Sequence, residues 1–205
     1  MANKLTTVYF EDNEIRLLVS SGKTVEKWAT APLDSGMIND GMILQEDAVA
    51  ERLKTLAANN GVSGSKAVAA LSGQNSIFRL IVIPEVPKNI LDDAIQSEAG
   101  RVIPVPLEQV FISRQELPGI NPHEMRFFLA AHPKNATDAL IRVLHKAGLK
   151  SKVLDVAPLA LARSSQLSRC VIVNTWLSSI DIVLMADRVP EVIRSFPLGA
   201  DSVPC

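Results

Sequence analysis

The segment Ile83–Phe111 has the sequence IPEVPKNILDDAIQSEAGRVIPVPLEQVF, in which prolines flank an amphipathic stretch. Apolar residues recur in it at the spacing of one helical face, which predicts a helix over Asn89–Val102. Pro104 and Pro106 end this helix, because proline lacks the amide hydrogen that would continue it. The chain is therefore expected to leave the helix in an extended conformation.

One acidic side chain, that of Glu98, falls on the apolar side of the predicted helix, three residues after Ile95. Arg101 follows three residues later, a spacing at which opposite charges pair on a helix. Two interpretations stay open. The pair lies at the edge of the core, or Glu98 is a polar anchor in a binding groove.

Strands and helices interleave on both sides of this segment, so the expected class is α/β or α+β. Short or alternating apolar runs predict the strands, and one-face periodicity predicts the helices. The predicted strands are Leu5–Phe10, Glu14–Ser20, Thr24–Ala31, Lys66–Leu71, Ile77–Ile83, Gln109–Glu116, Glu124–Ala131, Lys152–Val156, Arg169–Asn174, Ser179–Met185 and Val189–Phe196. The other predicted elements are helices Glu46–Asn59, Ala136–Ala147 (with Asn135 as N-cap) and Pro158–Ser164, and a loop Asp34–Gly41.

The first and last three strands resemble each other when the sequence is aligned with itself at one constant offset. Both triplets are strand, turn, strand, turn, strand, followed by Pro-Leu. The identical pairs at this offset are Ile15 with Ile180, Glu26 with Glu191, Pro32 with Pro197, and Leu33 with Leu198. Two unrelated β-meanders would look similar at this level, so a fold of two like halves and a chance likeness both stay open.

Composition and charge exclude several classes of protein. The chain has 205 residues, of which 47% are hydrophobic and 21% charged, and its net charge is −1. This balance is typical of a globular protein and provides no basic field for nucleic acid. No apolar run approaches the roughly 20 residues of a membrane span, and Met1–Leu5 opens no secretory signal. We therefore expect a soluble, cytoplasmic protein.

Motifs for catalysis or metal binding are missing from the sequence. Cys170 and Cys205 predict neither a disulfide nor a zinc site, Cys170 is expected to be a small buried hydrophobe, and the three histidines lack metal-ligand spacing. The stretch Ser20–Thr24 lacks the first glycine of a phosphate-binding loop, and no G-x-S-x-G elbow occurs. We therefore expect no metal and no nucleophilic catalysis.

Two segments carry a resemblance to a known family. Ile83–Phe111 is similar to the pattern lPxmPxxxLxxAIxxEAxxyIPfPLeeV of the PilM family, the actin-like proteins of type IV pilus assembly. Leu129–Arg163, LAAHPKNATDALIRVLHKAGLKSKVLDVAPLALAR, resembles a second block of that family. Competence proteins and the cytoplasmic domains of L-type secretion proteins are near neighbours that share the fold.

The resemblance implies an actin-like fold of two ribonuclease-H-like halves, with a small α+β subdomain inserted in the first. Residues 1–32 are then the first strand triplet, 33–117 the insert, 118–168 the rest of the first half, and 169–205 the start of the second half. Because the family continues well beyond this length, the resemblance also implies a fragment or a shortened form.

The family binds ATP with magnesium at two turns that read like D-I-G-S-S and D-I-G-x-x. The residues of this chain at those turns are Asp12, Asn13, Asn174, Ser178 and Ser179. No glycine allows the backbone to approach a phosphate, Glu11 adds negative charge, and Trp176 replaces a glycine. We therefore expect no nucleotide cofactor and no enzymatic activity.

The resemblance implies a scaffold at the cytoplasmic face of the inner membrane. In the family, PilM binds the N-terminal peptide of the inner-membrane protein PilN in a groove between the first half and the insert, and links it to the assembly ATPase. The groove residues predicted here are Glu98, Arg101, Ile103 and Pro104. The alternatives are an actin-type ATP-binding switch and an FtsA-like, filament-forming division protein.

Overall fold

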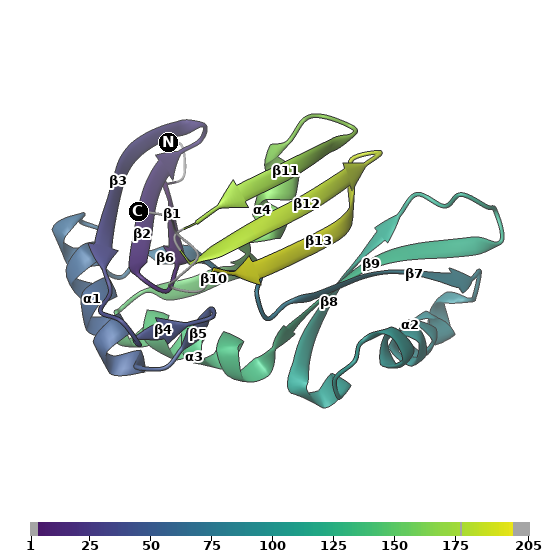
Figure 1. Cartoon of the computed structure of the whole chain (residues 1–205), viewed down its shortest axis with the longest axis horizontal. Helices are drawn as coiled ribbons and strands as arrows, with labels where there is room; N and C mark the ends of the chain where they lie inside the picture. The colour runs from purple at the N-terminus through teal and green to yellow at the C-terminus, as the bar shows by residue number, and fades with distance from the viewer. Residues whose placement is uncertain (1–3, 177, 199–205) are drawn as a thin grey trace. The chain divides into compact units, whose positions relative to one another are not determined.

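The computed structural model describes residues 4–176 and 178–198, which form two compact units (Figure 1). Unit 1 comprises the described residues of Met1–Gln74 and Ala136–Cys205, and unit 2 is Asn75–Asn135. None of the helices in the described part of the chain is long and apolar enough to cross a membrane.

The first sheet of unit 1 has five strands in the order β10-β6-β1-β2-β3 (Figure 1). β1, β2 and β3 form an antiparallel triplet, while β6 runs parallel to β1, and β10 parallel to β6. These strands are β1 (Lys4–Phe10), β2 (Glu14–Ser21), β3 (Thr24–Pro32), β6 (Lys66–Leu71) and β10 (Lys150–Val156).

Helices α1 (Glu46–Asn59) and α3 (Lys134–Lys146) pack on one face of this sheet and enclose the core of unit 1 with it. Alternate residues of β1 and β2 point to that face, because successive side chains of a strand alternate. Val8, Ile15 and Leu144 are completely buried there. Burial of each such side chain stabilises the fold by about 1.5–3 kcal/mol.

The second sheet of unit 1 is the antiparallel triplet β11 (Cys170–Thr175), β12 (Ser179–Ala186) and β13 (Val189–Pro197). Helix α4 (Ala157–Ser164) contacts β10, β12 and β13, so it lies against both sheets. Cys170 is half-buried rather than fully buried, and Val171 and Val173 are 60% and 59% exposed. The apolar character of β11 therefore does not reflect burial on both faces.

The two triplets repeat each other at the offset that relates Ile15 to Ile180. The amide of Leu33 donates to the carbonyl of Asn13 (2.8 Å), and the amide of Leu198 donates to the carbonyl of Ser178 (2.7 Å). β2 and β12 also carry a register shift at equivalent positions. The two triplets therefore share a hydrogen bond and an irregularity in strand pairing at equivalent positions. This confirms the interpretation of two similar halves and argues against two unrelated meanders.

Unit 2 is a small α+β unit with its own core. Its sheet has the order β7-β9-β8, and both pairings are antiparallel. Helix α2 packs on one face, where Ile95 and Ala99 join the buried residues of the strands. The elements are β7 (Ile77–Pro84), α2 (Lys88–Val102), a 3-10 turn (Leu107–Gln109), β8 (Val110–Leu117) and β9 (Glu124–Pro133).

The expected boundaries of the insert, 33–117, are wrong at both ends. α1 and β6 belong to unit 1, because β6 pairs with β1 and α1 packs on the first sheet. β9 belongs to unit 2, because it is the central strand between β7 and β8. The insert is therefore residues 75–135.

Two local predictions also need correction. The expected loop Asp34–Gly41 contains β4 (Ile38–Asn39), which pairs with β5 (Met42–Ile43) in a short hairpin. The third helix begins at Lys134, so Asn135 lies inside the helix and is not its N-cap. Short hairpins and helix ends depend on contacts that periodicity does not show.

Candidate functional site

Two equivalent turns, β1–β2 and β11–β12, form the candidate site in unit 1. The amide of Glu11 donates to the carbonyl of Glu14 (3.0 Å), and the amide of Trp176 donates to the carbonyl of Ser179 (2.8 Å). The repeat offset relates Glu11 to Trp176 and Glu14 to Ser179. The two turns therefore have the same hydrogen-bonded form, with different side chains at matching positions.

The indole of Trp176 lies against the first sheet. Its ring centroid is 5.2 Å from that of Tyr9, and the guanidinium carbon of Arg16 is 4.4 Å from it. The indole Nε1–H donates to Oδ2 of Asp181 at 3.3 Å. One side chain of the second triplet thus contacts both β1 and β2 of the first.

Glu11 is a buried carboxyl beside this stack, 2% exposed. Neither of its carboxyl oxygens has a hydrogen-bond partner among the described residues, and Nη2 of Arg16 is 3.8 Å from Oε2. Burial raises the pKa of Glu11 to about 7, against the lowering effect of Arg16. Burial, together with the charge of Glu11, also raises the pKa of Tyr9.

Asp12, expected at the first phosphate turn, is used to hold the β4–β5 hairpin. Its two carboxylate oxygens accept the amides of Asp40 and Gly41, each at 3.0 Å. Asp40 and Gly41 have φ angles of 48° and 74°, the left-handed conformation of a tight hairpin turn. The carboxylate therefore points to backbone amides of its own chain.

The polar side chains beside the second turn also make hydrogen bonds within the protein. Asn174 Nδ2 lies 3.5 Å from Oδ2 of Asp181, and Ser195 Oγ donates to Oδ1 of the same carboxylate. Asp181 is 1% exposed, as is Ser179. Leu177, between the expected residues of this turn, lies outside the described residues.

These turns do not fit the ATP and magnesium that the resemblance implies. A phosphate would meet the carboxyl of Glu11 and the indole of Trp176 where close backbone amides are needed. The carboxylate of Asp12 already accepts hydrogen bonds from two backbone amides of the β4–β5 hairpin. Within residues 4–176 and 178–198, no group of three or more His, Cys, Asp or Glu side chains could hold a metal ion.

The residues expected in a partner groove lie at the C-terminal end of α2. Arg101 Nη1 donates to Oε2 of Glu98 at 3.1 Å, the pairing expected from their spacing. The Arg101 side chain is 77% exposed, Glu98 is half-buried and Pro104 is exposed. The structure therefore brings these three residues to one accessible end of the helix.

Ile103 does not share that exposure. It is 5% exposed and belongs to the core of unit 2, together with Ile81 and Phe127. Its prediction as an accessible residue of the groove is therefore wrong. The backbone turns to the extended conformation at Ile103, and the side chain packs into the core rather than outward.

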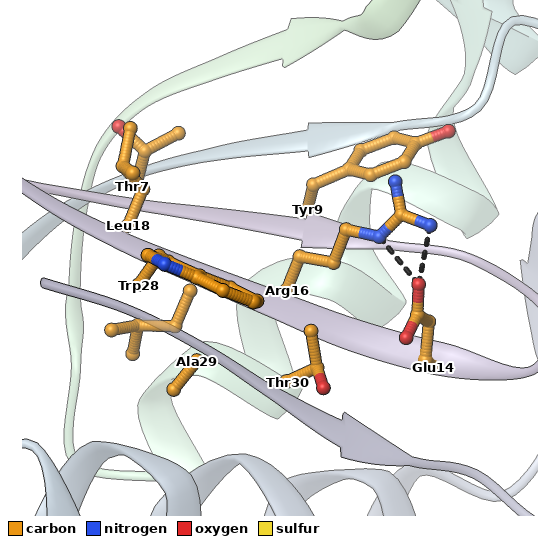
Figure 2. Close-up of a pocket in the computed structure, with 9 residues that line it drawn as sticks. Thr7, Tyr9, Glu14, Arg16, Leu18, Trp28, Ala29 and Thr30 are labelled. Atoms are coloured by element: carbon orange, nitrogen blue, oxygen red, sulfur yellow. Dashed lines mark hydrogen bonds and ion pairs between the residues drawn. The ribbon is translucent and has the colours of Figure 1, made fainter.

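A pocket of about 490 Å³, which was not predicted from the sequence, lies on the face of the β1–β2–β3 triplet opposite the core (Figure 2). Leu18, Trp28 and Tyr9 form apolar walls, and Trp28 is 73% exposed. Arg16, paired with Glu14, forms the polar end. The signal available in the sequence was the large side chains of Tyr9 and Leu18, which alternate along β1 and β2 with the residues that face the core.

A sequence model of the family described as "Type IV pilus assembly protein PilM" matches residues 14–187. The chain belongs to the PilM family. The match runs from the start of β2 to just past the end of β12. It therefore includes the last residue of the first turn, the whole second turn and all of unit 2.

Solved structures agree with an actin-like fold for this PilM-family chain. A chain of the "PilM-PilN type IV pilus biogenesis complex" is 24% identical with a TM-score of 0.80, and the match covers 95% of this chain and 62% of that one. The cytoplasmic domain of EpsL, an inner-membrane component of the type II secretion system of Vibrio cholerae, is 14% identical with a TM-score of 0.65, over 95% and 71%. This chain spans less than two thirds of the length of the first of these.

Proposed function

We propose that this PilM-family chain is a non-catalytic scaffold of type IV pilus assembly that binds a short peptide of a PilN-type membrane protein. The observation that carries the proposal is the match of 95% of the chain to a protein solved in a PilM–PilN complex, at a TM-score of 0.80. Through its partner, the scaffold would lie at the inner face of the cytoplasmic membrane. A link to the assembly ATPase is part of the same proposal.

The two turns support a scaffold over an ATP-binding switch. Buried Glu11 and the stacked indole of Trp176 stand where a nucleotide would need backbone amides, and Asp12 is bonded to the β4–β5 hairpin. We therefore propose that the protein works without a bound nucleotide and is not an enzyme. No contact in the described residues favours an FtsA-like filament.

The end of α2 offers polar groups suited to an extended peptide. Arg101 presents a largely exposed guanidinium with several donors, and half-buried Glu98 keeps carboxylate oxygens beside it. Pro104 stands in the extended segment that follows the helix. A peptide bound at a helix end uses such groups for its main chain and an apolar surface for its side chains. We propose that Glu98, Arg101 and Pro104 belong to the peptide site.

The proposal is tested with a fluorescently labelled peptide from the cytoplasmic N-terminus of the PilN-type protein of the same organism. We expect saturable binding to the full chain by fluorescence anisotropy. Arg101→Ala and Glu98→Gln are each expected to weaken binding about 10- to 150-fold, the effect of losing a hydrogen bond to a charged group. Gln96→Ala, an exposed change on another side of α2, is the matched control.

Absence of binding by the unmodified chain would contradict the proposed partner. Binding that is unchanged in both Arg101→Ala and Glu98→Gln would place the peptide site elsewhere on the molecule. Loss of binding in all three variants, including Gln96→Ala, would indicate a general effect on α2 and would also argue against these residues as specific contacts.

A further inference from the structure

The turns disagree with the nucleotide implied by the family, and this disagreement has a structural counterpart. We infer that Trp176, Arg16 and Tyr9 form an intramolecular clasp, which joins the two strand triplets of unit 1 without any nucleotide. The clasp consists of one indole from the β11–β12 turn and two side chains from β1 and β2. It does not depend on peptide binding.

The clasp is built from equivalent positions of the two halves. Tyr9 and Arg16 face each other across β1 and β2, and Asn174 and Asp181 face each other across β11 and β12. The repeat offset relates Tyr9 to Asn174 and Arg16 to Asp181. The repeat thus places a cation in one half and an anion in the other, with Trp176 between them.

Each neighbour of Trp176 uses a different part of the indole. Arg16 lies over the ring, where the negative face of the π system attracts a cation. Tyr9 contacts the ring at an interplanar angle of 41°, and Asp181 accepts the indole N–H. The ring system and the polar atom of Trp176 are therefore both engaged, which fixes its orientation.

The contacts of Arg16 and the charge of Glu11 explain why the clasp disfavours a bound anion. The Arg16 guanidinium is shared between the carboxylate of Glu14 and the ring of Trp176, and it also lies near buried Glu11. Any phosphate entering the site would have to displace these contacts and approach an acidic side chain. The contact between the two triplets of unit 1 is therefore expected to be independent of ATP.

The clasp is tested by using Trp176 as the sole tryptophan. The chain has two tryptophans, so Trp28→Phe leaves Trp176 as the only indole. In this background we expect acrylamide to quench Trp176 weakly, and Mg-ATP to leave its emission unchanged. Adding Arg16→Met is expected to raise the quenching constant about two-fold or more, because the ring loses its cation. Arg52→Met, which removes the surface ion pair with Asp34, is the matched control and should change nothing.

A second measurement covers variants in which the fold itself is weakened. Hydrogen exchange of the unmodified chain and of Trp176→Gly is compared strand by strand. Trp176→Gly should speed exchange in β11 and β12 about ten-fold and leave unit 2 unchanged, because local contacts set local opening. Trp176 quenched as in the unfolded chain, an emission change on adding Mg-ATP, or unchanged exchange in Trp176→Gly would each overturn the clasp.

Discussion

Glu11 and Trp176 show how residues at one position of a repeated unit acquire different roles. Both begin the same type of turn, with the same backbone hydrogen bond. Trp176 is held by a cation, a ring and a carboxylate, whereas the carboxyl of Glu11 is buried with no hydrogen-bond donor among the described residues. The first turn therefore carries an electrostatic cost that the second does not.

That cost predicts a pH dependence of stability. The pKa of Glu11 is raised to about 7 in the folded protein, from 4.5. The folded state then binds the proton more tightly than the unfolded state, so the contribution of Glu11 to stability falls as pH rises from 4.5 to about 7. Above that range, ionised Glu11 destabilises the fold by roughly 3 kcal/mol.

Glu11→Gln removes this titration and nearly keeps the shape of the side chain. We expect the variant to be more stable than the parent at pH 8, by up to roughly 3 kcal/mol, and to lose most of that advantage at pH 5. Urea unfolding at both pH values measures the difference. Since all other groups are shared, a stability difference that is the same at pH 5 and pH 8 would contradict a raised pKa for Glu11.

At the scale of the element, α2 and the sheet of unit 2 depend on each other through Ile103. This residue follows the helix directly and is 5% exposed among strand residues such as Phe127. Ile103→Asp would place an unpaired carboxylate in that core, and we expect it to destabilise unit 2 by about 3–5 kcal/mol. That is as large as the whole stability expected of so small a unit.

Hydrogen exchange resolved by strand measures this effect. In Ile103→Asp, β7, β8 and β9 are expected to lose protection, while the first sheet of unit 1 keeps it. Pro104→Ala, one residue further on at an exposed position, is the control and should leave unit 2 protected. Full protection of β9 in Ile103→Asp would show that the side chain at position 103 is not needed in the core.

The elements themselves were predictable, because burial repeats along a strand or helix with a fixed period. The predicted helix Glu46–Asn59 and strand Lys66–Leu71 have the same bounds in the structure. Periodicity does not record which strands pair, so Lys66–Leu71 was placed in the insert although it pairs with β1. The same limit applied to Ile103, whose burial depends on strands that lie both before and after it in the chain.

Only part of the candidate site was predictable from the sequence. Trp176 could be recognised in the sequence as an obstacle to a phosphate. Its contacts with Tyr9 and Arg16 join the first strands of the chain to one of its last turns, and no local pattern relates them. Asp12 likewise has the right type for a metal ligand, and only the structure shows that it accepts the amides of the β4–β5 hairpin.

At the scale of the whole molecule, the two units separate two tasks. Unit 1 joins two repeated triplets through a clasp of its own side chains, and unit 2 presents the polar end of α2 that we assign to the partner. Neither task, as proposed, requires a nucleotide. A PilM-family chain of this kind would keep its two triplets joined whenever it is folded, so we expect that ATP does not control partner binding.

This organisation predicts that ATP does not stabilise the protein. A ligand that binds only the folded state at 100 times its Kd adds about 2.7 kcal/mol to the free energy of unfolding. For a chain of this size, that raises Tm by roughly 5–10 °C. We expect millimolar Mg-ATP to shift Tm by less than about 1 °C, since an unbound ligand adds nothing to the free energy of unfolding.

Magnesium chloride alone is the control for ionic effects. An ATP-specific rise of several degrees would favour the actin-type switch over the scaffold. If the rise persisted in Trp176→Gly and grew larger, the indole would be competing with the nucleotide for the same site.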